Sequence, residues 1–84
     1  MRVFAHINGV RYELAPYHFQ NGVDRVRDKL RGLLAGASTP LEEFEVLTGE
    51  DRGSSQLAVA PQRVWSVMLE VVEDDDYDVT ESIR

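Results

Sequence analysis

The side chains that could carry catalysis or hold a metal are few in this chain. Cysteine does not occur, which excludes disulfides, thiolate zinc sites and a cysteine nucleophile. The two histidines, His6 and His18, lack a second histidine or a carboxylate at metal-ligand spacing. The serines lack the context of a nucleophile elbow, and the sequence holds neither a phosphate-binding loop nor a dinucleotide fingerprint. We therefore predict a protein that is not an enzyme and that uses no cofactor and no metal.

Acidic residues gather at the C-terminal end. Residues 73–84 carry six acids against Arg84, a balance of −5, whereas residues 1–72 are nearly neutral at −1. The run Asp74–Asp76 lacks the interleaved spacing and the glycine of a calcium loop. Blocks of like charge are usually solvated. We predict a single domain at residues 1–72 and a flexible acidic tail at 73–84, with docking of that tail on a basic surface as the alternative.

Cations cluster in the segment Arg25–Arg31, which is predicted to be helical. The predicted helix has four cations there against Asp24 and Asp28, and helical spacing places Arg25 and Lys29 opposite the apolar stripe. Clustered cations are what nucleic-acid phosphates bind. A nucleic-acid-associated regulator that uses this helix is therefore the alternative function. The nearly neutral body and the acidic tail oppose a polyanion, so nucleic acid is not the preferred partner.

The clearest structural signal in these 84 residues is Asn8-Gly9, between two alternating segments within residues 3–14. A type I′ turn needs positive φ at both central residues, and Asn-Gly is a preferred pair for it. A two-residue loop pairs Ile7 with Val10 and fixes the register of the whole hairpin, because side chains alternate along a strand. The hairpin therefore presents one apolar face.

Helical spacing follows the hairpin. Asn21 is the predicted N-cap, although some helix could begin earlier, and residues 36–40 contain the signals that end the helix. The apolar stripe comprises Val23, Val26, Leu30, Leu33, Leu34 and Ala37.

Three strands are predicted after the helix, at residues 42–48, 56–60 and 64–72, with turn residues between them. The last of these strands should bury Trp65, Val67, Leu69 and Val71. The order ββαβββ with tight turns predicts an α+β domain, in which one helix packs on one face of a mainly antiparallel, five-stranded sheet.

One helix cannot cover both faces of such a sheet. The apolar residues expected on the uncovered face are Phe4, Leu47, Val64, Met68 and Val72. A contiguous apolar patch usually marks a partner surface; the alternative is that these residues are scattered and covered by the tail. We predict a small interaction module whose partner is a protein or a second copy, a homodimer formed through the open sheet face or an edge strand.

The composition also bears on location and source. No stretch approaches the ~18 apolar residues that span a bilayer, and the N-terminal segment is interrupted too early for a signal peptide. A cytoplasmic location without membrane contact is predicted. Arginine outnumbers lysine eight to one, which indicates the GC-rich codon usage of a bacterium or its phage.

Overall fold

The computed structural model describes residues 1–35, 41–49, 53–73 and 78–83. Along the chain the elements are β1 (Arg2–Ile7), β2 (Val10–Glu13), the 3-10 helix η1 (Pro16–Phe19), α1 (Asp24–Leu34), β3 (Glu42–Thr48), β4 (Gly53–Val59), the 3-10 helix η2 (Pro61–Arg63), β5 (Val67–Val72) and β6 (Asp78–Ser82). This confirms the α+β class and the predicted order of elements, to which the structure adds a further strand at the C-terminal end.

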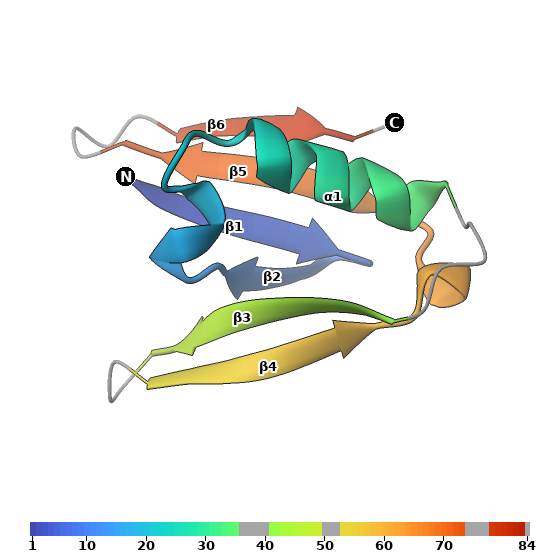
Figure 1. Cartoon of the computed structure of the whole chain (residues 1–84). Helices are drawn as coiled ribbons and strands as arrows, with labels where there is room; N and C mark the ends of the chain where they lie inside the picture. Colours follow the sequence, from blue (N-terminus) through green and yellow to red (C-terminus); the bar gives the residue numbers. More distant parts are fainter. Residues whose placement is uncertain (36–40, 50–52, 74–77, 84) are drawn as a thin grey trace.

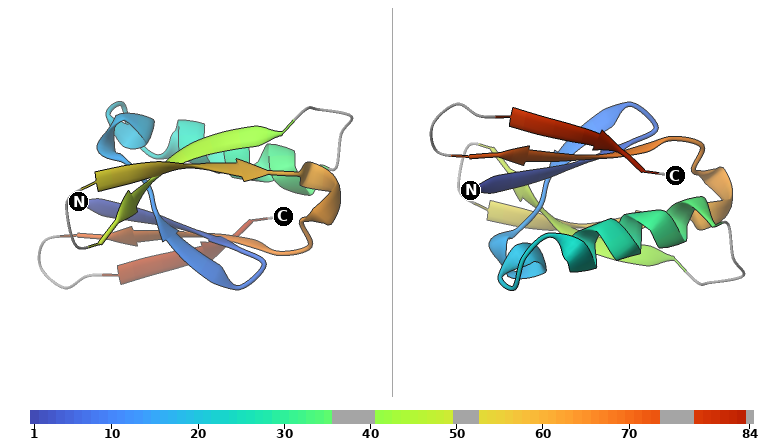
Figure 2. Two further views of the ribbon diagram at one scale, coloured as in Figure 1. Left: turned by 90° about the horizontal axis from the view of Figure 1, so that it is seen from below. Right: turned by 90° about the horizontal axis from the view of Figure 1, so that it is seen from above.

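Over the described residues, the strands form two sheets instead of the expected single sheet. The larger has the order β2-β1-β5-β6, the smaller is the β3–β4 hairpin, and every pairing is antiparallel. An isolated bridge between Leu14 and Val46 joins the two sheets, and Ala15 N–H donates to the Glu45 carbonyl at 2.9 Å. Helix α1 and the β3–β4 hairpin lie on the same side of the larger sheet (Figures 1 and 2). The other side of that sheet is its outer face.

The β1–β2 hairpin confirms the prediction from Asn8-Gly9. Both residues have positive φ, 53° and 82°, and β1 pairs with β2 in the expected register, with Ile7 opposite Val10. Alternation then directs Val3, Ala5 and Ile7 toward α1 and the β3–β4 hairpin, and Phe4 toward the outer face. Leu14, just past β2, is 1% exposed and continues this apolar face.

The core fills the space between the larger sheet, α1 and the β3–β4 hairpin. Its buried residues are Val3, Ala5, Ile7, Leu14, Phe19, Val26, Leu30, Leu33, Phe44, Val46, Val67, Leu69 and Ile83. The helical stripe is confirmed for its buried members on α1, but Asn21 is not the N-cap. Val23 is the N-cap residue of α1 and makes no side-chain cap hydrogen bond. The 3-10 helix η1, with Pro16 at its start, lies before it in the chain. The predicted helix end at 36–40 lies outside the described residues.

Residues 78–83 belong to the folded body, which corrects the prediction of a solvated tail after residue 72. Strand β6 pairs with β5, and Ile83 is 4% exposed while its N–H donates to the Val67 carbonyl at 3.0 Å. Glu81 accepts hydrogen bonds from the Arg27 guanidinium on α1, the shortest at 2.9 Å. Residues 73–84 hold six acids, and this charge conceals the strand-like alternation of residues 78–83 in the sequence. The Asp74–Asp76 run lies outside the described residues.

Strand β5 begins at Val67, so the prediction that Trp65 is buried in a strand is wrong. The Trp65 residue is 76% exposed. The Asn8 side-chain oxygen accepts hydrogen bonds from Trp65 N–H at 2.9 Å and Ser66 N–H at 3.3 Å, and Asn8 N–H donates to the Ser66 carbonyl at 2.8 Å. The hairpin turn thus holds this segment through its backbone and leaves the indole outside. Strand β4 starts at Gly53 and not at residue 56, so the prediction of a turn over residues 49–54 is wrong for Gly53 and Ser54. Residues 50–52 of that predicted turn lie outside the described residues.

Candidate functional site

The outer face of the larger sheet is closed by charged side chains. Phe4 lies on this face as predicted, yet it is only 3% exposed. The guanidinium carbon of Arg11 lies 3.6 Å from the centre of the Phe4 ring, and that of Arg2 lies 5.0 Å away. Guanidinium groups favour aromatic faces, and their apolar stems add cover. Alternation placed Phe4 correctly, but the long arginine side chains of the same face remove it from solvent.

Glu70 is the centre of this closed face, and it is only 4% exposed. It accepts two hydrogen bonds from Arg11, at 2.9 and 3.0 Å, and its Oε1 lies 2.7 Å from His6 Nε2. These contacts, the Arg11 hydrogen bonds first, lower the pKa of Glu70 to about 2 despite burial. The Asp78 carboxyl beside Glu70 has a raised pKa, through its hydrogen bond with Glu70 and partial desolvation. No sequence pattern reveals this cluster, because Glu70 meets His6 and Arg11 only through the β1–β5 pairing.

The residues of the predicted interface do not form one surface. Met68 and Val72 are half-buried on the outer face with Glu70 between them on β5. Leu47 is half-buried on β3, in the other sheet. Val64 packs against the core cluster. The expected patch assumed one continuous sheet, and the division into two sheets separates its members.

An apolar groove lies at the end of the molecule where the hairpin turn faces β4 and η2. It has a volume of about 500 Å³, and its lining includes Val64 and the β4 residues Leu57 and Val59. The lining also includes Val10 and Leu41, which are 50% and 58% exposed. Val64 is thus the predicted interface residue that reaches this groove.

Strand β4 forms an open edge beside this groove. It pairs with β3 over all seven residues, and no other strand in the described parts of the chain pairs with it. The sequence Gly53–Val59 contains no charged residue and no proline, and Ser54, Ser55, Gln56 and Ala58 are exposed. Proteins usually protect such edges with charges, proline, bulges or a covering element. The other edge, β6, carries Asp78 and Glu81 and is tied to α1.

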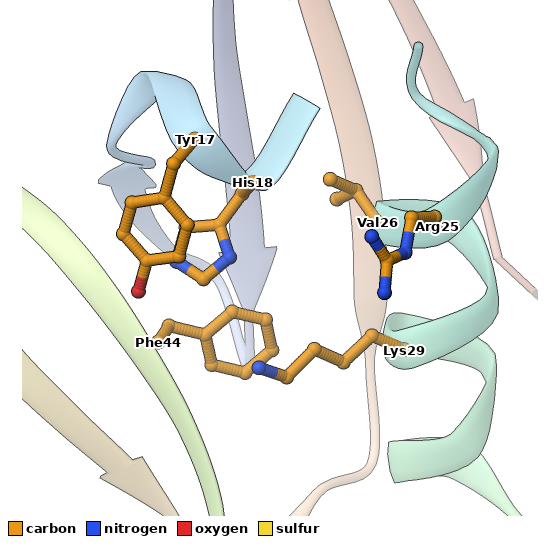
Figure 3. A pocket seen from close by; sticks show the side chains of 6 residues that line it. All are labelled: Tyr17, His18, Arg25, Val26, Lys29 and Phe44. Atoms are coloured by element: carbon orange, nitrogen blue, oxygen red, sulfur yellow. The ribbon is translucent and has the colours of Figure 1, made fainter. Parts of the chain in front are cut away.

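The two cations of the nucleic-acid alternative, Arg25 and Lys29, line a second pocket of about 410 Å³ (Figure 3). Tyr17, His18, Val26 and Phe44 complete its lining. Lys29 Nζ donates to the Glu43 carbonyl and lies 4.4 Å from the centre of the Phe44 ring. The His18 ring stacks on Tyr17 with centroids 4.2 Å apart. The structure therefore brings together the predicted cations and adds an aromatic wall that sequence reasoning did not associate with them.

Comparisons with known proteins add no assignment: no family model, curated protein or solved structure matches this chain significantly. Among the described residues, no three histidine, aspartate or glutamate side chains lie together in a way that could hold a metal ion. The helix that the structure describes is too short to cross a membrane. The proposals below rest on the geometry of the chain itself.

Proposed function

We propose that this chain is a protein-interaction module that forms a homodimer by pairing the β4 strands of two copies. The observation that carries the proposal is the unprotected edge: seven residues in regular pairing on one side, with neither charge nor proline among them. An extended strand with an open edge is a template for another strand, because the backbone N–H and C=O groups of β4 that point away from β3 meet no other strand among the described residues.

A second copy suits this edge because β4 is self-complementary. An antiparallel pair centred on Gln56 places Ser54 opposite the partner's Ala58 and Ser55 opposite the partner's Leu57. No like charges meet, and the two Gln56 amides can hydrogen-bond each other across the axis. The exposed Val10 and Leu41 of the adjoining groove add apolar surface on the same side of the molecule as the end of β4.

The nucleic-acid alternative has less support. Lys29 is engaged with the Glu43 carbonyl, and its Nζ lies 4.0 Å from the Glu42 carboxylate. Arg27 and Arg31 on the same helix are paired with acids of their own. A backbone of phosphates needs several accessible cations together, and Arg25 is the one cation of α1 for which the described residues supply no hydrogen-bond or ion-pair partner.

The experiment is sedimentation velocity at micromolar concentration on wild type and Gln56→Lys. The expected result is a dimer for wild type and a monomer for Gln56→Lys, because the substitution places two ammonium groups opposite each other across the axis. Thr80→Lys, an exposed position on the other edge, is the matched control and should remain dimeric. A monomeric wild type, or a dimer that Gln56→Lys leaves intact, would overturn the proposal.

A further inference from the structure

The pocket in Figure 3 concentrates positive charge in a chain whose net charge is −6. Arg25 and Lys29 project into it from one face of α1, and none of the described side chains that line it is acidic. At about 410 Å³ its volume falls within the range of small-molecule sites, and it is lined by an aromatic wall with a few polar groups. These features are independent of β4 and of the proposed dimer.

Arg25 differs from the other cations of α1. Arg27 is paired with Asp24 at 2.6 Å and with Glu81 at 2.9 Å, and Arg31 is paired with Asp28 at 3.2 Å. Lys29 donates to the Glu43 carbonyl. Arg25 makes no hydrogen bond or ion pair with any residue that the structure describes. An exposed guanidinium at the pocket thus keeps its full set of donors, in a geometry that matches carboxylate and phosphate oxygens.

His18 supplies a second donor. Its Nε2 accepts a hydrogen bond from Glu45 N–H at 3.0 Å, so the neutral ring carries its proton on Nδ1. Partial burial, followed by the charge of Lys29, lowers the pKa of His18, which keeps the ring neutral near neutral pH. The ring lies against the pocket with its second nitrogen on the side of Arg25 and Lys29 (Figure 3). Strand β3 therefore fixes the tautomer that presents an N–H to the pocket.

We propose that this pocket binds a small ligand through one oxyanion group, a phosphate ester or a carboxylate, which accepts hydrogen bonds from Arg25 and from His18 Nδ1–H. Lys29 adds positive charge without having to leave Glu43. The Tyr17 ring, which is half exposed and stacked on His18, forms a wall for the remainder of the ligand. The Glu42 carboxylate lies 4.0 Å from Lys29 Nζ and offsets part of the positive charge at that side chain.

The test is a titration of wild type with inorganic phosphate and, separately, with benzoate, followed by two-dimensional amide NMR at neutral pH. The expected result is saturable shifts for at least one probe, at residues of η1 and the first turns of α1 together with Phe44. The probe that binds more tightly identifies the source of the oxyanion, because both share the same recognition chemistry.

Arg25→Gln should weaken that binding by about tenfold or more, since a hydrogen bond to a charged group contributes about that factor. Arg31→Gln is the matched control on the same helix and should bind as wild type does, because Arg31 is paired with Asp28 and does not line the pocket. Dispersed amide spectra verify that both variants remain folded.

Two results would overturn the inference: no saturable shift with either probe at millimolar concentration, or equal binding by wild type and Arg25→Gln. A third would replace it. A single-stranded deoxythymidine oligomer that binds at the same residues, and that excess phosphate does not displace, would assign the pocket to nucleic acid. Because these readouts do not involve β4, they are separable from the outcome for the dimer.

Discussion

Two edge strands of the described structure, β6 of the larger sheet and β4 of the smaller one, differ in how they are protected. Strand β6 carries acids, is bonded to α1 through Glu81 and Arg27, and is followed by the buried Ile83. Strand β4 has no charge along its length and pairs, within the described residues, only with β3. The outer face of the larger sheet is protected in the same way as β6, because paired charges around Glu70 cover it. The proposed interface therefore rests on the uncharged edge of β4 and not on apolar residues of a sheet face.

The largest effect is expected from breaking the anchor of β6. Ile83→Ala should cost about 3 kcal/mol in the free energy of unfolding, because it leaves a cavity where a buried side chain packed. Val79→Ala is the control on the same strand, with a side chain that is 45% exposed, and should cost less than about 1 kcal/mol. Urea unfolding measures both. Equal, small losses would show that residues 78–83 are not anchored as the structure has them.

A smaller effect, dependent on pH, is expected at the closed face. The pKa of Glu70 is lowered from 4.5 to about 2, so its contribution to stability is complete above pH 4.5 and is lost as the pH falls toward 2. The loss should be on the order of 2 kcal/mol, because Arg11 is half exposed and solvent screens the pair. Thermal unfolding from pH 5 to pH 2 tests this.

Glu70→Gln is the matched variant for that titration, because glutamine keeps the shape and does not titrate. Its stability should vary less between pH 5 and pH 2 than that of wild type. The Glu13 carboxylate, whose pKa is lowered by Arg2, leaves a residual slope of the same sign in both proteins. Parallel curves for wild type and variant would contradict the assignment of Glu70 as the main acid-sensitive group.

The smallest effect on stability is expected at the open edge. Gln56→Lys should change the free energy of unfolding of dilute protein by no more than about 0.5 kcal/mol, because Gln56 is exposed and makes no side-chain contact with the core. The same variant is expected to abolish the dimer. A large destabilisation in dilute solution would show that the strand needs Gln56 for its pairing with β3, and would remove the contrast between the two edges.

Local rules predicted the parts of the fold that depend on neighbouring residues. The turn at Asn8-Gly9 and the strand at residues 42–48 follow from turn chemistry and alternation. The failures have long-range causes. Trp65 is exposed because Asn8, far away in sequence, binds its backbone. The strands form two sheets because, in the described residues, the only bridge between them joins Leu14 and Val46. The periodicity of the sequence does not reveal which strands pair.

The candidate sites show the same division. The charges of Arg25 and Lys29 and their shared helix face were readable from helical spacing, and the two residues do line one pocket. That His18 would complete the pocket depends on the path of η1 and on a hydrogen bond from Glu45. Glu70 could not be linked to His6 without the register of β1 against β5. The uncharged stretch Gly53–Val59 was visible in the sequence, and its significance depends on the strand being an edge.

The most direct test of the proposed β4 pairing is amide hydrogen exchange of the wild-type protein at high and low concentration. Pairing between copies would engage those β4 N–H groups that point away from β3, so alternate β4 amides should exchange slowly in concentrated protein and faster on dilution. The amides of β6 should not change, because its contacts lie within one copy. Exchange along β4 that is the same at both concentrations, in protein dilute enough to dissociate any dimer, would contradict the account.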